Sequence, residues 1–507
     1  MSGVATFASL GLTDALILGP APDPAAAVTG LSVDSRHTRP GHLFAALKGV
    51  KADGADFAQY AVRMGAAAVL CSLDGALRAR AQIGGFPVPF IIDAAPRRRL
   101  AQVAARFFGA QPEVMVAVTG TNGKTSVASF TRQIWAALGL RAVNFGTTGV
   151  EGAVTRALAA TTPEPIELHA LLADLAAAGV AHAAMEASSH GLAQARLDGV
   201  RLAAGGFTNL TRDHMDYHAD AADYAAAKLG LFARVLPQGA AAAANADDPL
   251  FAVIADIARS RGLRLIGVGR AADAALRLTG AAYHAEGQTL RFAWDGADHE
   301  AALPLIGGFQ GANALIAAAL AIGAGAEPGA VFAALPGLRG VRGRMEHVAT
   351  RANGARVYVD YAHTPDALTT ALAALRLHTA GRLVVVFGAG GDRDAGKRPL
   401  MGAAAAAAAD LAIVTDDNPR SEDPAAIRAA IRAAAPEAED CGDRAEAILR
   451  GVDALGPQDR LLIAGKGHET GQIVGAETLP FDDAEMARAA VAALDGPDLN
   501  DAEGDAP

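Results

Sequence analysis

The chain has 507 residues with a formal net charge of -10, and 51% of its residues are hydrophobic. It is too long for a single hydrophobic core, so three domains are expected, and its acidic balance argues against nucleic acid as the main partner. The two cysteines, Cys71 and Cys441, form no disulfide framework, and the N-terminus lacks the basic segment of a secretory signal, so a reducing cytosol is expected.

The fold class follows from how apolar runs alternate with turns along the chain. Residues 31–54, LSVDSRHTRPGHLFAALKGVKADG, have the composition of a loop between short strands. Farther along, β-branched runs at 114–118, 383–387 and 461–464 each lead into a glycine-rich turn and a helix rich in alanine or leucine. This alternation predicts an α/β protein with parallel sheets.

A phosphate-binding loop is predicted at residues 114–126, VMVAVTGTNGKTS. A buried strand leads through a glycine-containing turn into an amphipathic helix that continues through Trp135. Backbone N–H groups of such a turn face an anion, Lys124 can reach the β and γ phosphates, and the Thr125 hydroxyl can bind Mg²⁺. The first glycine of the general GxxxxGK[ST] pattern would fall on Val118, and Gly120 makes the turn instead. An ordinary glycine-rich turn is the alternative.

Two polar segments follow the phosphate loop. In residues 185–199, MEASSHGLAQARLDG, Glu186 ends a predicted strand and precedes a turn at 188–190, where its carboxylate is well placed to hold Mg²⁺. Residues 208–218, TNLTRDHMDYH, place His214 and His218 four residues apart. A zinc helix is disfavoured there because the segment lacks the glutamate of HExxH. A solvated polar turn is the remaining alternative for His218 and Asp216.

Lys228 lies in DYAAAKLGLF, at a helical position among apolar residues. Removal from water would favour its neutral amine, which can add CO₂ to form a carbamate. From these residues alone, an exposed helix lysine is the simpler interpretation.

Residues 303–326 carry no charge and are long enough to span a bilayer, but Pro304, paired glycines and polar residues interrupt them. A buried helix near 314–322 is predicted instead. The turn-rich segment 335–343, LPGLRGVRG, suits a hinge, and the acidic tail 496–507 is expected to be disordered.

The TGTNGKT loop resembles that of the Mur ligase family, which also includes folylpolyglutamate and cyanophycin synthetases, and the resemblance extends over nearly the whole chain. It implies three α/β domains: a UDP-sugar-binding domain at 1–110, a P-loop ATPase-like parallel sheet at 111–338, and a Rossmann-like amino-acid-binding domain at 339–495.

The resemblance also implies functional residues for ATP and Mg²⁺. Contacts to ATP are expected from Gly120, Thr121, Asn122, Gly123, Lys124, Thr125, Ser126, Asn313, Arg344 and Asp360. Asn313 is expected to begin the uncharged helix and contact adenine, whereas Gln310 stands where many members have asparagine. The implied metal ligands are Thr125, Glu186, His214 and a carbamate on Lys228, and the implied catalytic residues are Lys124, Lys228, His214 and Arg344.

The resemblance further implies the two other substrates. A UDP-N-acetylmuramoyl-L-alanyl-D-glutamate acceptor would be held by Ser35, Thr161, Thr162, Ser188, Gln194 and Arg196, with Ala160 where asparagine is common. The DNPR segment is typical of members that add meso-diaminopimelate, expected here at Arg393, Asp417, Asn418, Pro419, Arg420, Gly465 and Glu469. Guanidinium groups can pair with the far carboxylate that lysine lacks, and Glu469 can receive the accompanying ammonium.

The expected reaction is therefore phosphorylation of a carboxylate by ATP followed by attack of an amine, in a cytoplasmic monomer with no membrane insertion. No general base for the amine is identifiable. A lysine-adding or folylpolyglutamate ligase is the alternative within the same class. A phosphate-loop switch protein, which would hydrolyse nucleotide without depending on an amino acid, is the alternative from another class.

Overall fold

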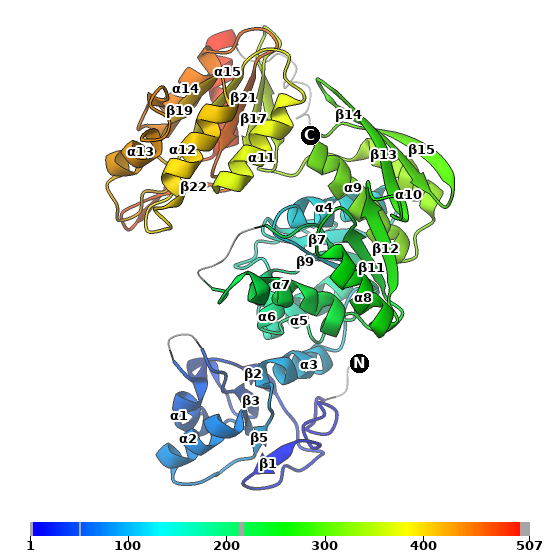
Figure 1. The fold of residues 1–507 in the computed structure, drawn as a ribbon. Coiled ribbons are helices and arrows are strands. Elements are labelled where there is room, and N and C mark those ends of the chain that lie inside the picture. The colour runs from blue at the N-terminus through cyan, green and yellow to red at the C-terminus, as the bar shows by residue number, and fades with distance from the viewer. Residues whose placement is uncertain (1–3, 50–51, 212–216, 497–507) are drawn as a thin grey trace, which may run out of the picture. The chain divides into compact units, whose positions relative to one another are not determined.

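The computed structural model describes residues 4–49, 52–211 and 217–496, which divide into two compact units. Unit 1 comprises the chain as far as Ala274 together with Ile316–Pro328, and unit 2 comprises Ala275–Leu315 and the residues from Gly329 onward. Figure 1 shows the elements of both units. His214 and the predicted disordered tail, apart from Gly496, lie outside the described residues.

Unit 1 begins with a five-stranded sheet in the order β1-β5-β4-β3-β2, parallel except for β1. Its elements are β1 (Leu16–Leu18), β2 (Gly30–Ser32), η1 (Ser35–His37), β3 (His42–Ala45), η2 (Gly54–Phe57), α1 (Ala58–Arg63), β4 (Ala68–Cys71), α2 (Leu73–Ile83), β5 (Phe90–Ile92) and α3 (Pro96–Phe108). The segment expected to be a loop between short strands instead contains η1 and the strand β3, which pairs with β2 and β4.

A second sheet carries the phosphate loop, and within unit 1 its strands run in the order β12-β11-β10-β6-β9-β7-β8, parallel except for β8. Its elements are β6 (Val114–Thr119), α4 (Lys124–Ala137), β7 (Ala142–Gly146), β8 (Gly149–Gly152), α5 (Pro165–Ala177), β9 (His182–Glu186), α6 (Ser189–Ala193), β10 (Ala204–Phe207), α7 (Ala221–Gly230), η3 (Leu231–Val235), β11 (Ala241–Asn245), α8 (Phe251–Arg261) and β12 (Arg264–Gly269).

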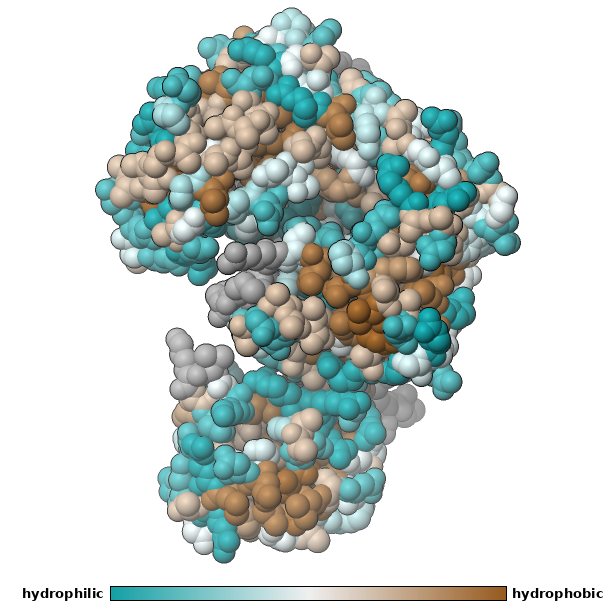
Figure 2. All heavy atoms as spheres, viewed as in Figure 1, coloured by the Kyte–Doolittle hydropathy of each residue, from teal (hydrophilic) through white to brown (hydrophobic). Residues whose placement is uncertain are grey.

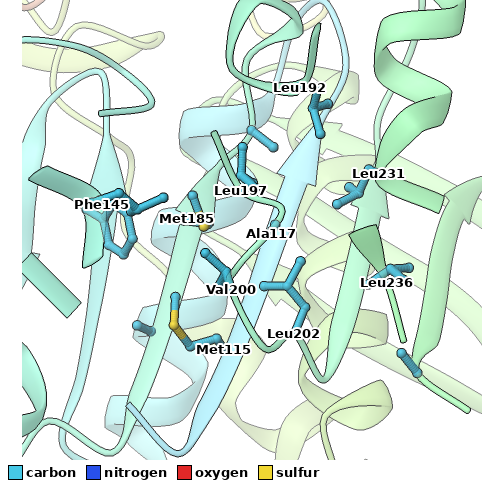
Figure 3. Close-up of a cluster of buried hydrophobic side chains, with 14 of the residues drawn as sticks. Met115, Ala117, Phe145, Met185, Leu192, Leu197, Val200, Leu202, Leu231 and Leu236 are labelled. Carbon is cyan, nitrogen blue, oxygen red and sulfur yellow. The ribbon is translucent and has the colours of Figure 1, made fainter. Parts of the chain in front are cut away.

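The core of this sheet explains why β6 is apolar from Val114 to Val118. Met115 and Ala117 lie on one face with Phe145 and Met185 of the neighbouring strands (Figure 3), while Val116 is buried on the other face. A parallel strand covered on both sides needs apolar residues throughout. The predicted strand and its helix are confirmed.

Unit 2 contains an antiparallel set, β13-β14-β15, and a six-stranded sheet in the order β16-β17-β21-β18-β19-β20, in which only β16 is antiparallel. Its elements include β13 (Leu276–His284), β14 (Gly287–Trp294), β15 (Ala297–Leu303), β16 (Glu346–Thr350), β17 (Arg356–Asp360), α11 (Pro365–Arg376), β18 (Leu383–Phe387), α12 (Lys397–Ala408), β19 (Leu411–Val414), α13 (Pro424–Arg432), β20 (Glu439–Asp440), α14 (Arg444–Asp453), β21 (Arg460–Ala464), the hairpin β22 (Gly471–Val474) and β23 (Glu477–Pro480), and α15 (Asp483–Asp495). The predicted strands at 383–387 and 461–464 are confirmed as β18 and β21.

The uncharged segment forms helix α9 (Gly308–Gly323), followed by α10 (Pro328–Ala334) and η4 (Leu335–Gly337). Residues 314–321 are all buried, which confirms the predicted buried helix. The prediction that Asn313 begins this helix is wrong. The chain turns into the helix earlier, through the positive φ of Gly307.

No helix in the described part of the chain is long and apolar enough to cross a membrane. On the face drawn in Figure 2, hydrophobic residues form limited groups among hydrophilic ones. Cys71 and Cys441 are both free and buried.

A buried histidine on α5 predicts how stability depends on pH. His169 is 2% exposed, and burial, with a smaller effect of Arg201, lowers its pKa to about 4. Between pH 6.5 and 4 the unfolded chain binds this proton and the folded chain does not. The free energy of unfolding should therefore fall by up to about 1.4 kcal/mol per pH unit from this group as the pH decreases through that window.

Denaturant titrations from pH 7 to pH 4 on wild type and on His169→Leu measure this contribution. The substitution should flatten the slope of stability against pH between 6.5 and 4. Identical slopes for the two proteins would contradict the assignment.

Candidate active site

The phosphate loop joins β6 to α4, and two glycines shape it. Gly120 has φ +145° and Gly123 has φ +89°, values that side-chain-bearing residues rarely adopt. A Cβ on Gly120 would also collide with the hydroxyl of Thr208, which donates to the Asn122 carbonyl at 2.6 Å. The loop can therefore follow this path only with glycine at position 120.

Hydrogen bonds within the loop and to neighbouring elements fix its path. The N–H groups of Thr121 and Asn122 donate to the carbonyl and side-chain oxygens of Asn209 at 2.8 and 3.0 Å. The Thr121 hydroxyl lies 3.1 Å from that of Tyr224. Lys124 folds back over the loop and donates to the carbonyls of Gly120 and Thr121 at 3.0 and 2.8 Å. The predicted phosphate ligands thus converge on one short loop.

The predicted magnesium residues Thr125 and Glu186 lie in contact. Because β6 pairs with β9, Glu186 reaches the start of α4, where the Thr125 hydroxyl donates to its Oε2 at 3.1 Å. The other oxygen accepts from the Thr147 N–H at 2.8 Å, and Glu186 is 2% exposed. A carboxylate and a hydroxyl beside a phosphate loop supply the hard oxygen ligands that Mg²⁺ prefers, so these residues fit the ion.

The two other predicted ligands are His214 and Lys228. His214 lies outside the described residues, and within the described part of the chain no group of three His, Cys, Asp or Glu side chains could hold a metal ion. Lys228 on α7 is 1% exposed, so the exposed helix position that the residues alone favoured is wrong, and its Nζ donates to the Gly120 carbonyl at 2.7 Å. Lys124 donates to the same carbonyl, so two lysine side chains converge there.

The residues predicted to hold the acceptor substrate form a network next to Glu186. The Thr162 hydroxyl donates to the Glu186 carbonyl at 2.9 Å and accepts from the Ser188 N–H at 3.0 Å. The hydroxyls of Thr147 and Thr161 lie 3.1 Å apart. The segment 188–190, predicted to be a turn, instead begins the short helix α6, because the Ser188 hydroxyl caps it by accepting from the Gly191 N–H.

Arg196 belongs to this network but is already paired. Its guanidinium donates to the Thr162 carbonyl at 2.6 Å and to Gln194 Oε1 at 2.9 Å, and it contacts the Glu164 carboxylate at 2.6 Å. An anionic substrate group would have to compete with Glu164 for it. Ser35 lies elsewhere in unit 1, buried in η1 after the strand β2.

In unit 2, the segments predicted to contact ATP hold one another by hydrogen bonds. Asp360, at the end of β17, accepts from the N–H groups of Met345 and Ala362 at 2.7 and 2.9 Å. Burial raises the pKa of Asp360, and the nearby positive charge of Arg344 opposes that rise. The Arg344 guanidinium lies 4.5 Å from the centre of the Tyr361 ring. On α9, the Asn313 amide donates to Gln310 at 3.1 Å.

The residues predicted to bind diaminopimelate gather where β18, β19 and β21 end. Asn418 Nδ2 donates to Glu469 Oε2 at 2.9 Å, and Arg420 donates to the Gly391 carbonyl at 2.8 Å. Arg420 adopts φ +51°, which its pairing with the β22 strand maintains. Arg393 is exposed in the loop after β18. This region presents acidic and basic groups together, as a zwitterionic ligand requires.

Comparison with known proteins shows the family of this chain. Residues 27–108 match the catalytic domain of the Mur ligase family, 118–321 the Mur ligase middle domain, and 343–467 the Mur ligase glutamate ligase domain. The chain belongs to the Mur ligase family.

Among the similar Mur ligases, UDP-N-acetylmuramoyl-L-alanyl-D-glutamate--2,6-diaminopimelate ligase from Bradyrhizobium diazoefficiens is 55% identical, over 92% of this chain and 95% of its own. The enzyme of the same name from Brucella melitensis is 53% identical, also over 92% and 95%. A solved structure of a ligase with this name is 31% identical, with a TM-score of 0.72 over 97% of this chain and 99% of its own. The folylpolyglutamate synthase of Mycobacterium tuberculosis, at 19% identity and a TM-score of 0.61 over 79% of this chain and 95% of its own, shares the fold.

Several residues of the Mur ligase site were not predicted. Thr147 and Asn209 follow β7 and β10, so they lie at the carboxyl ends of strands, where ligands bind in parallel sheets. That rule would have found both. Lys466 lies inside the AGKGHE segment next to the predicted Gly465, and its burial was not expected from the sequence.

Proposed function

We propose that this chain is an ATP-dependent ligase that joins meso-diaminopimelate to UDP-N-acetylmuramoyl-L-alanyl-D-glutamate, forming the UDP-N-acetylmuramoyl-tripeptide of peptidoglycan synthesis. The observation that carries the proposal is that relatives 53–55% identical over 92% of the chain bear the name of this activity. The contact of Thr125 with Glu186 beside the phosphate loop supports ATP-dependent chemistry.

The reaction has two steps. The γ-phosphoryl group of ATP passes to the γ-carboxylate of the D-glutamyl residue, giving ADP and an acyl phosphate. The diaminopimelate amine then attacks the acyl carbon, the C–N bond forms, and phosphate leaves with the bonding electrons while the amine loses a proton. Catalysis of this kind depends mostly on positioning and on neutralising phosphate charge.

Each residue of the phosphate loop has a proposed part in the first step. The loop from Gly120 to Ser126 would bind the phosphates. The N–H groups of Thr121 and Asn122, like the Lys124 ammonium, would exchange their present acceptors for phosphate oxygens. Thr125 and Glu186 would hold Mg²⁺, which supplies charge neutralisation at the transferred group. From unit 2, Arg344 would offset charge on the phosphoryl group, and Asn313 and Asp360 would contact the nucleotide.

Lys228 is proposed to carry a carbamate. The convergence of Lys228 and Lys124 on one carbonyl oxygen supports this, because two ammonium groups so placed repel each other. The neutral Lys228 amine would add CO₂ and release one proton, so a cation becomes an anionic oxygen ligand. With His214, it would complete the predicted magnesium ligands.

The substrate contacts remain as predicted from the sequence. Ser35, Thr161, Thr162, Ser188, Gln194 and Arg196 are proposed for the UDP-muramoyl-dipeptide, and the loops containing Arg393, residues 417–420, Gly465 and Glu469 for diaminopimelate. We further propose the three domain boundaries given above, a cytoplasmic location and a monomeric state. Sedimentation of the purified protein would test the monomeric state.

Replacing Glu186 by glutamine tests the magnesium site. The amide keeps the size of the side chain and an oxygen for the Thr147 N–H, but it removes the negative charge. We expect the Mg²⁺ concentration needed for half-maximal activity to rise about tenfold or more, because a neutral amide binds the ion less strongly. Initial rates over a Mg²⁺ titration give this value. An unchanged Mg²⁺ requirement would rule out Glu186 as a ligand.

The deciding experiment for function measures phosphate release from ATP with UDP-N-acetylmuramoyl-L-alanyl-D-glutamate present. Diaminopimelate, lysine and glutamate are offered in turn, and only diaminopimelate should stimulate release and yield the tripeptide product. Stimulation by lysine but not by diaminopimelate would overturn the substrate assignment. Release that responds to none of the three would favour a nucleotide switch.

A further inference from the structure

A buried lysine lies behind the loop proposed to bind diaminopimelate. Lys466 is 0% exposed, and its Nζ donates to Asn418 Oδ1 at 3.1 Å and lies 3.4 Å from Glu469 Oε2. Glu469, in contrast, keeps 35% of its side chain exposed. Removing an ammonium group from water in this way costs free energy unless hydrogen bonds and a nearby carboxylate compensate for the lost hydration.

The neighbours of Asn418 determine which way its amide points. On one side are the Lys466 ammonium and the Ile473 N–H, at 3.1 and 2.9 Å, and both are donors only. On the other side is the Glu469 carboxylate, at 2.9 Å, which accepts. The oxygen of the amide must therefore face Lys466 and Ile473, and the NH₂ group must face Glu469.

This orientation sets the chemistry that Asn418 offers to a ligand. The oxygen already accepts two hydrogen bonds, whereas the NH₂ group has two protons and gives one to Glu469. Asn418 therefore presents a donor, which suits a carboxylate. A flipped amide would present its oxygen, which suits an ammonium group such as that at the end of the lysine side chain.

We propose that Lys466 is a positioning residue for amine selection: it holds the Asn418 amide with its donor group toward the ligand and so favours diaminopimelate over lysine. This inference rests on the proposed function. Lys466 acts through Asn418. Gln472 supports the same loop, because its Nε2 donates to the Asp417 carbonyl at 2.8 Å.

A double-mutant cycle on the full-length enzyme tests this role, with kcat/KM for diaminopimelate as the readout. Lys466→Met keeps the length of the side chain and removes the donor, and we expect a loss of about tenfold, the usual effect of one charge-assisted hydrogen bond. Asn418→Ala alone should lose as much or more. In the double variant, the loss should be no greater than for Asn418→Ala, because Lys466 acts through that amide.

The matched control is Arg382→Met, which also replaces a cation of unit 2 by methionine. Arg382 pairs with the carboxylate of Asp459 and not with the residues of the cycle. Its effect should add to that of Asn418→Ala. We also expect Lys466→Met to leave the KM for ATP unchanged and to lower the preference for diaminopimelate over lysine. If Lys466→Met does not fold, as judged by thermal unfolding, Lys466→Leu, which also lacks a donor, takes its place in the cycle.

Additive losses for the Lys466 and Asn418 variants, or an unchanged preference between the two amines, would overturn the role of Lys466. Failure of the proposed function would look different, because wild-type enzyme would then show no stimulation by diaminopimelate at all.

Discussion

Replacing Lys124 by methionine should reduce ligation by about a thousandfold or more, while the protein remains folded. Methionine nearly matches the length of the lysine side chain but cannot donate to the phosphate oxygens or offset their charge. A charged donor aimed at a transferred phosphoryl group commonly contributes this much to the rate. Single-turnover phosphate release at saturating ATP measures the loss in the chemical step.

Two controls separate catalysis from structure in this variant. Lys124 also donates to the carbonyls of Gly120 and Thr121, so thermal unfolding must show that the loop and the sheet survive its loss. Binding of UDP-N-acetylmuramoyl-L-alanyl-D-glutamate should be unchanged. An activity within tenfold of wild type would show that Lys124 does not contact the transferred group.

Replacing Lys228 by alanine should also abolish ligation, but here a small molecule should restore part of it. If the native side chain carries a carbamate, the alanine variant loses an anionic ligand and leaves space for one. Acetate or another short carboxylic acid can then supply the missing oxygen ligands, and the rate should rise with its concentration until it saturates. The measurement is tripeptide formation at several acetate concentrations, at constant ionic strength.

Lys124→Met is the matched control for this rescue, because it also removes a lysine that contacts the Gly120 carbonyl. Acetate should not restore that variant, and chloride should restore neither. Full activity of Lys228→Ala without additive would exclude the carbamate. Rescue by methylamine instead of acetate would indicate that the ammonium form of Lys228 is the active one.

The sequence was most informative where a local rule has a structural consequence. The carboxyl ends of neighbouring parallel strands meet at one edge, so a glutamate ending β9 was expected near the loop after β6, and the contact between Glu186 and Thr125 confirms this. The buried helix was also predictable, because proline, glycine and polar residues interrupt the uncharged segment 303–326 and argue against a membrane span. The fold class, α/β with parallel sheets, is also confirmed, because apolar runs that alternate with turns and helices are typical of such sheets.

Contacts between residues distant in sequence were not predictable in this way. Lys228 and Gly120 are far apart along the chain, and nothing in either segment indicates that the amine reaches that carbonyl. The pairing of Arg196 with Glu164 could not be foreseen, since an arginine near a substrate segment looks the same whether free or paired. The start of α9 was placed wrongly because nothing in the sequence indicates that the chain turns into the helix at Gly307, where the backbone has a positive φ.

The pairing of the DNPR loop with the β22–β23 hairpin also constrains how these enzymes can evolve or be redesigned. Residues 417–420 are held by hydrogen bonds to Gln472, Ile473 and Gly475, so the loop and the hairpin form one structural module. Replacing the loop alone with that of a lysine-adding enzyme would leave it without its supports. A transplant designed to test the proposed choice of amine must therefore carry both segments, and natural changes in one should be accompanied by changes in the other.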